Sequence, residues 1–323
     1  MANLAADGIK LATAFGLVAA VAVPIALGLT ALLKSRNRAV CPPWRAPGSR
    51  YPGWLVLMAM IGVQHVLPSF LVSIAQRFHL LDFLADAAAL RGMYARVALV
   101  PVVLVAGWWV QSRVLEQSID FGRMADELPR WIVLAVACWL TFGTATYGLN
   151  WLVSFAYEWL KWPLIEHPIA RVGTQDGTGG VLIALSACLA APILEELLFR
   201  GLLLSWLHGP RHRVWYAHAV TLLLTGMIAF GPTRSTGPIA FAVLLSLGQL
   251  ALEWSRYKTL RVMWASSAPF ALMHAAIWPS PIPLFVLSLG LGYLAMRTRS
   301  WLPSALAHAL FNAASLVFLL LPG

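Results

Sequence analysis

The most unusual stretch of the chain is a charged group inside an apolar segment, Ala-Pro-Ile-Leu-Glu-Glu-Leu-Leu-Phe-Arg-Gly at residues 191–201. It places Glu195, Glu196 and Arg200 where a membrane-spanning helix would have its middle. Each charge at a helix centre costs about 2.5 to 3.5 kcal/mol on insertion scales. The three charges must therefore be compensated by partners, by a function, or by both.

Helix geometry separates the two acids. Glu196 and Arg200 stand four residues apart, with the acid on the favoured N-terminal side, so they are expected to pair. Glu195 points about 100° away and shares a face with Phe199 and Leu202. A carboxylate without a partner in a poorly hydrated site is suited to general acid–base work near neutral pH. The alternative is that both acids only hold helices together.

Two histidines and an asparagine lie in other apolar segments. The spacing of Phe270-Ala-Leu-Met-His274 and of His308-Ala-Leu-Phe-Asn312 predicts that each pair shares one helical face. Either histidine alone could simply be packed or hydrogen-bonded. Together with the two carboxylates, however, these side chains are the components of a hydrolytic site. Glu and His can activate water or hold a divalent metal, and His and Asn can donate to an oxyanion.

The composition places these residues in a membrane. Of 323 residues, 60% are hydrophobic and 11% are charged, against about 25% charged in a typical globular domain. A net charge of +10 would indicate nucleic-acid binding in a soluble protein, but the apolar excess indicates a lipid bilayer instead, and we expect no nucleic-acid partner. Three cysteines without short spacing, Cys41, Cys138 and Cys188, indicate neither a disulfide framework nor a cysteine zinc site.

Apolar runs predict an all-α, polytopic transmembrane bundle of roughly ten segments, or eight to ten spans. The first run, 11–33, is too long for the apolar core of a signal peptide, so we keep it as a span. The third, eighth and ninth are near the lower length limit for spanning. The predicted segments are 11–33, 52–75, 97–112, 131–157, 181–207, 214–230, 237–254, 262–278, 281–296 and 301–321.

The basic residues predict the orientation of this bundle. The loop 34–50 holds five Lys or Arg and no acid, which is typical of a cytoplasmic loop. Strict alternation of ten spans then places 15 basic residues inside and seven outside. We therefore expect a multi-pass protein of the plasma membrane, which would be the inner membrane of a bacterium.

A polar, Gly-rich segment at 158–180 divides the chain. It separates an N-terminal region, 1–180, of about four spans from a C-terminal region, 181–323, of six spans. Nothing in the sequence indicates an oligomeric state.

The ordered motifs Glu-Glu-x-x-x-Arg, Phe-x-x-x-His and His-x-x-x-Asn resemble those of the CPBP family of intramembrane proteases. This family includes the type II CAAX prenyl endopeptidases and bacteriocin-processing relatives. The segment Leu-Gly-Tyr-Leu-Ala-Met-Arg-Thr-Arg-Ser-Trp-Leu-Pro-Ser before His308 also resembles the family's glycine-containing helix and basic turn. The resemblance covers about 181–321, whereas residues 1–180 match no family that we recognise.

The resemblance implies a role for each motif position. Glu195 would activate the attacking water with help from His274, and His308 and Asn312 would bind the oxyanion. In the metalloprotease description, Glu195, His274 and His308 would instead hold zinc or another divalent metal. Glu196 would belong to the catalytic group, with Arg200 and Phe270 in support.

The chain departs from the family in the 69 residues between Arg200 and Phe270. They hold an inserted pair of apolar helices at about 214–254, and a pair preserves the orientation of the helices that follow.

These features predict an intramembrane endopeptidase that hydrolyses a peptide bond of a membrane-embedded or lipid-modified protein or peptide. One alternative is a non-proteolytic scaffold or immunity protein of the same fold. Another is a proton-coupled transporter, which is disfavoured because the acids are confined to one helix and no two halves of the chain look alike.

Overall fold

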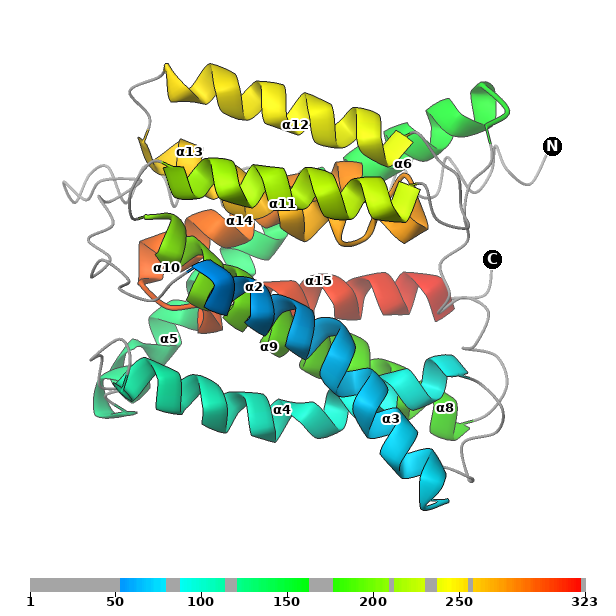
Figure 1. Cartoon of the computed structure of the whole chain (residues 1–323), viewed down its shortest axis with the longest axis vertical. Helices are drawn as coiled ribbons and strands as arrows, with labels where there is room; N and C mark the ends of the chain where they lie inside the picture. Colours follow the sequence, from blue (N-terminus) through cyan, green and yellow to red (C-terminus); the bar gives the residue numbers. More distant parts are fainter. Residues whose placement is uncertain are drawn as a thin grey trace.

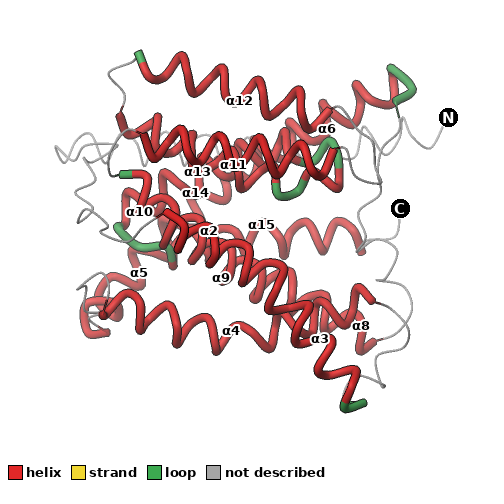
Figure 2. Tube along the Cα trace, in the orientation of Figure 1, coloured by secondary structure: helices red, strands yellow, loops and turns green. Residues whose placement is uncertain are grey.

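The computed structural model describes residues 53–79, 88–113, 121–162, 177–208, 212–229, 237–254 and 258–320. Within these ranges every regular element is a helix (Figures 1 and 2). The all-α prediction is therefore confirmed for the described residues, and the predicted span 11–33 lies outside them.

Three long helices come first in the described chain. The first, which we call helix 53–77, joins α2 (Gly53–Ile61), the π-helical segment η1 (Gly62–Val66) and α3 (Leu67–Arg77). The second is α4 (Ala88–Arg113). The third joins α5 (Phe121–Cys138), the π-helical segment η2 (Trp139–Gly143) and α6 (Thr144–Trp159).

The helix that carries the two acids, which we call helix 177–207, is built from five consecutive pieces. They are α8 (Gly177–Leu185), η3 (Ser186–Ala190), α9 (Ala191–Glu196), η4 (Leu197–Leu203) and α10 (Leu204–Leu207), with η3 and η4 π-helical. Six helical elements follow it: α11 (His212–Ala229), α12 (Gly237–Glu253), α13 (Lys258–Leu272), the 3₁₀ turn η5 (Ala275–Ile277), α14 (Pro281–Thr298) and α15 (Leu302–Leu320).

Prolines explain where two of the π-helical segments lie. Pro68 is the second residue after the end of η1, and Pro192 is the second residue after the end of η3. A proline inside a helix lacks an N–H and its ring collides with the carbonyl four residues earlier. A wider π turn before the proline relieves this conflict, so each chain segment continues as one helix.

Within the described ranges, fewer helices qualify as membrane spans by length and composition than the roughly ten that we predicted. Among the described residues, four helices qualify: Gly53–Arg77, Asp126–Trp159, Gly179–Leu207 and Pro281–Thr298. Two shorter apolar helices, Gly237–Glu253 and Leu302–Phe318, add to them. These helices make the chain an integral membrane protein, but the prediction of roughly ten spans is not confirmed.

Helix 177–207 lies in the middle of the bundle, in contact with α2, α4, α13 and α15 (Figure 1). On one side, Leu198 and Phe199 pack in a buried apolar cluster with Val56 of α2 and Phe270 of α13. On another side, Leu194 and Leu197 pack with Leu99 and Val103 of α4. The central helix is therefore held rigidly at the level of its acids.

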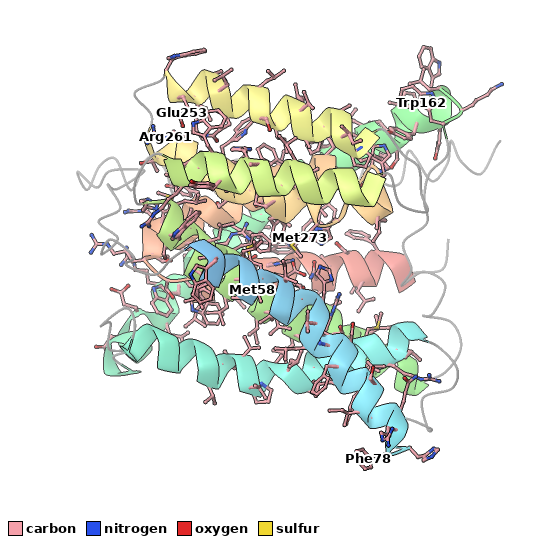
Figure 3. All side chains as sticks on the ribbon, viewed as in Figure 1. Met58, Phe78, Trp162, Glu253, Arg261 and Met273 are labelled. Atoms are coloured by element: carbon pink, nitrogen blue, oxygen red, sulfur yellow. The ribbon has the colours of Figure 1, made fainter. Side chains whose placement is uncertain are left out.

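Helices α11 and α12, which we predicted to be an insertion, cover α13 at one edge of the bundle (Figure 1). Arg261 of α13 pairs with Glu253 at the end of α12 at 3.2 Å, and Figure 3 shows the two side chains next to each other. The Trp264 ring N–H of α13 also donates to the Leu245 carbonyl of α12 at 2.8 Å. Helix α12 is thus tied to α13, the helix that leads to His274.

Candidate active site

The predicted pair of Glu196 and Arg200 forms inside the bundle. Nη1 of Arg200 donates to Oε1 of Glu196 at 2.8 Å, and neither side chain is exposed. Nη2 of Arg200 donates to both oxygens of Ser288 on α14, the carbonyl at 3.0 Å and Oγ at 2.8 Å. Because the guanidinium bonds both to Glu196 and to α14, it joins helix 177–207 to a second element.

His308 of α15 shares the same carboxylate. Its Nδ1 lies 3.0 Å from Oε1 of Glu196, and the imidazole is buried. A carboxylate that accepts from Arg200 can only accept from the ring as well, so Nδ1 carries the hydrogen. The Nε2 atom of His308 is then the one left for chemistry. Oε2 of Glu196 is buried and has no hydrogen-bond partner within the described residues.

Phe270 is the centre of the aromatic contacts in the site. Its ring lies 4.5 Å from Cζ of Arg200, a cation–π distance. The ring centroids of His274 and His308 are each 5.6 Å from that of Phe270. Phe270 therefore packs near both imidazoles and limits where each ring can lie, which makes it a positioning residue.

The shared helical face that we predicted for Phe270 and His274 is wrong in detail. Helix α13 ends at Leu272, and the amide of His274 bonds to the Ala271 carbonyl at 3.0 Å in a tighter turn. Nδ1 of His274 nevertheless donates to the Phe270 carbonyl at 3.1 Å. Because a carbonyl only accepts, Nδ1 carries the hydrogen, and the Nε2 lone pair of the neutral ring is left free.

Glu195 differs from Glu196 in its surroundings. Its side chain is only partly buried, and it forms no hydrogen bond to any residue that the structure describes. The nearby Arg200 guanidinium interacts with it through charge alone. Of the two neighbouring carboxylates, Glu195 is thus the one that no hydrogen bond within the described residues holds in place.

Asn312 lies one helical turn after His308 on α15, as the spacing predicts. Its side-chain amide donates to the Ala187 carbonyl at 2.7 Å. Ala187 belongs to the π-helical segment η3, so this bond docks α15 on helix 177–207. The amide nitrogen carries two hydrogens, and the second remains for another acceptor.

The predicted metal ligands are of suitable types but are not assembled. Within the described ranges, no three His, Cys, Asp or Glu side chains gather closely enough to hold a metal ion. The arrangement therefore does not fit a ready-made zinc centre. A metal held by Glu195, His274 and His308 stays a prediction, and we derive no step through it.

Ser288 is the site residue that sequence reasoning missed. It is fully buried and accepts from Arg200, yet it stands 88 residues from its partner. The available signal was weak: apart from Tyr293, Ser288 is the only polar side chain in the apolar run 281–296.

One protein-family model matches part of the chain. The family model described as type II CAAX prenyl endopeptidase Rce1-like matches residues 177–268 and 253–314. Residues 177–314 are therefore similar to this family, and the match confirms the resemblance predicted from the motifs for this part of the chain. No curated protein and no solved structure matches the chain.

The matched ranges contain every residue of the candidate site, from Glu195 to Asn312. The three helices of the described chain before residue 177 lie outside them. The family model therefore does not cover the part of the described structure that precedes residue 177.

Proposed function

We propose that this protein is an intramembrane endopeptidase whose attacking water is activated by Glu195. The observation that supports this most is the unequal use of the two acids. Glu196 accepts from Arg200 and His308 at 2.8 and 3.0 Å, whereas Glu195 forms no hydrogen bond within the described structure. A carboxylate that is held nearby but left unbonded can accept a proton from water.

In the proposed reaction, Glu195 takes a proton from water as the oxygen attacks the substrate carbonyl carbon. His274 assists through its Nε2 lone pair, which accepts a hydrogen bond from the same water. The proton on Glu195 then passes to the nitrogen of the leaving amine. This sequence breaks one C–N bond and one O–H bond, forms one C–O bond and one N–H bond, and restores Glu195.

His308 and Asn312 are proposed to stabilise the oxyanion. When both ring nitrogens of His308 carry a hydrogen, Nδ1 can donate to Glu196 while Nε2 donates to the oxyanion. The second hydrogen of the Asn312 amide supplies another bond. Donors fixed in advance are effective because they need no reorganisation when charge develops, and here both are fixed, by Glu196 and by the Ala187 carbonyl.

The substrate class follows from the position of the site. Because the acids lie within a helix that qualifies as a membrane span, the scissile bond of the substrate must reach them at the membrane. We propose a membrane-associated protein or peptide, with a prenylated C-terminal CAAX sequence as the first candidate from the family description.

The test compares cleavage by purified wild type, Glu195→Gln and Glu158→Gln in detergent. The substrates are a prenylated CAAX peptide and an unmodified membrane-spanning peptide. We expect Glu195→Gln to lower kcat by at least about 10²-fold. The matched control Glu158→Gln changes an exposed acid outside the matched domain, and it should cleave as wild type does. Equal cleavage by all three proteins would sink the proposal.

The metal prediction needs a separate measurement. Elemental analysis of wild type and His308→Ala should show one zinc per chain, lost in the variant, if zinc is held as the family resemblance implies. Wild type that cleaves without bound metal would remove that part of the prediction and leave the role of Glu195 intact.

A further inference from the structure

Helix 53–77 lies outside the matched family ranges but carries an unexplained buried amide. Its inward face holds Val56, Gln64 and Pro68, whereas Met58 on the other side is exposed (Figure 3). Gln64 is 7% exposed, and its Nε2 has no hydrogen-bond partner among the residues described. A buried N–H group without a partner is costly, so its presence calls for an explanation.

The position of Gln64 along the bundle follows from helix packing. Helix 53–77 runs antiparallel to helix 177–207 (Figure 1), and Gly53 lies so close to the Trp206 ring that an added Cβ would be 2.5 Å from it. Gln64 follows Gly53 by eleven residues, and Glu195 precedes Trp206 by eleven residues. Both steps cover roughly 16 Å at about 1.5 Å per residue. Gln64 and Glu195 therefore lie at the same depth.

Side-chain packing places Gln64 at this level independently. The preceding residue, Val63, packs against the cluster that contains Leu194 and Leu197, the residues on either side of the two acids. It also packs against the cluster that contains Leu198 and Phe199. Farther along the same helix, α3 packs on α4, and Leu71 of α3 packs against the same cluster as Val63.

Gln64 and Glu195 are thus at one depth but do not bond to each other. Neither side chain forms a hydrogen bond within the described part of the chain. Each nevertheless comes from one of two helices that pack together only a few turns away. Two unbonded polar groups arranged in this way suit a polar ligand that binds both.

A substrate peptide is such a ligand. A segment that is unwound for cleavage in a membrane exposes carbonyl and N–H groups, each of which is costly without a partner. A neutral amide supplies a donor at a lower desolvation cost than a charged group would. It also adds no further positive charge beside Glu195.

We propose that Gln64 is a substrate-binding residue whose Nε2 donates to a main-chain carbonyl of the peptide held against Glu195. This inference rests on the proposed function and extends the site to helix 53–77, outside the family domain. The substrate peptide then lies between helix 53–77 and helix 177–207.

The first test is Gln64→Leu, which keeps the approximate size of the side chain and removes the unbonded amide. A purely structural role predicts only a change in stability, and here the thermal midpoint should stay or rise because no hydrogen bond is lost. The value of kcat/KM should fall about tenfold or more, as expected for one lost donor. The matched control is Gln76→Leu, at an exposed position of the same helix. Wild-type kcat/KM for Gln64→Leu would overturn the inference.

The second test measures binding without turnover. Fluorescence anisotropy of a labelled prenylated CAAX peptide is recorded with Glu195→Gln alone and combined with Gln64→Leu or Gln76→Leu. The Gln64 combination should bind at least about fivefold more weakly than the Gln76 combination. Equal affinities would refute the role of Gln64, whatever the cleavage assay shows.

These outcomes separate the two proposals. One outcome is that the Gln64→Leu combination binds the peptide more weakly but the wild type does not cleave it. This outcome contradicts the endopeptidase mechanism and supports the binding role of Gln64. Cleavage that depends on Glu195 but not on Gln64 does the reverse. An absence of peptide binding by Glu195→Gln itself contradicts both.

Discussion

At the scale of single residues, the site depends on one buried ion pair. Arg200 and Glu196 are fully enclosed and joined at 2.8 Å. Desolvating both charges offsets most of their attraction, so the pair itself adds little stability. The main effect of the pair is to position neighbouring helices, because Arg200 also bonds Ser288 on α14 and Glu196 also bonds His308 on α15. The pair therefore fixes three helices around the water-activating carboxylate.

We expect Arg200→Leu to destabilise the protein by about 3 to 5 kcal/mol, because it leaves the Glu196 carboxylate buried with one donor lost. Unfolding in detergent, followed by circular dichroism, measures this loss. The control is Arg130→Leu, which breaks a 2.8 Å pair with Glu127 at a partly exposed site and should cost at most about 1 kcal/mol. Similar losses for both variants would contradict the structural role given to Arg200.

The sequence was sufficient for contacts within one helix. The bond between Glu196 and Arg200 depends only on a spacing of four, so it could be predicted. The partners Ser288 and Ala187 could not, because each stands far along the chain from the residue it binds and only the packing of α14 and α15 brings it close.

At the scale of elements, close helix packing depends on Gly290. A Cβ at this position of α14 would overlap the Phe142 ring on the neighbouring π-helical segment. The absence of a side chain lets α14 approach α6 closely. Ser288, which binds Arg200, stands two residues earlier on α14, so a shift of α14 would also move Ser288.

We predict that Gly290→Val lowers the free energy of unfolding by about 1 to 3 kcal/mol through overpacking, and that it reduces cleavage because α14 moves. Thermal unfolding and the peptide assay measure the two effects. Gly92→Ala is the control, since nothing lies within 4 Å of an added Cβ there. That change should be neutral, or stabilising by up to about 1 kcal/mol. A neutral Gly290→Val would show that the helices are less closely packed than described.

Helix ends and π-helical segments were the elements that sequence patterns did not reveal. The apolar run predicted at 262–278 continues past Leu272, where α13 ends, because Met273, Ala275 and Ile277 are as apolar in a turn as in a helix. Hydrophobicity alone therefore could not predict that His274 lies beyond the end of the helix that carries Phe270. Pro68 and Pro192 did mark where the helical pattern had to adapt.

At the scale of the whole molecule, the predicted apolar segments from 52 onward each overlap a described helix, but overlap does not establish that a helix crosses the membrane. The count from length and composition omits α4. Yet α4 packs along α8, η3 and α9, the first three pieces of helix 177–207, which does qualify as a span. A helix packed lengthwise on a spanning helix must lie in the same slab of membrane.

We therefore expect α4 to cross the bilayer. A reporter fused after Gln117 should then lie on the cytoplasmic side, together with reporters after Arg50 and after Arg299. If α4 lay along the surface, only helix 53–77 would separate Arg50 from Gln117, and the Gln117 reporter would be on the opposite side. Paired alkaline phosphatase and fluorescent-protein fusions distinguish these results. If Gln117 were external, the loop after Trp159 would lie on the opposite side of the bilayer from the one assigned here. The segment from Glu195 to Leu207 would then also run toward the opposite side.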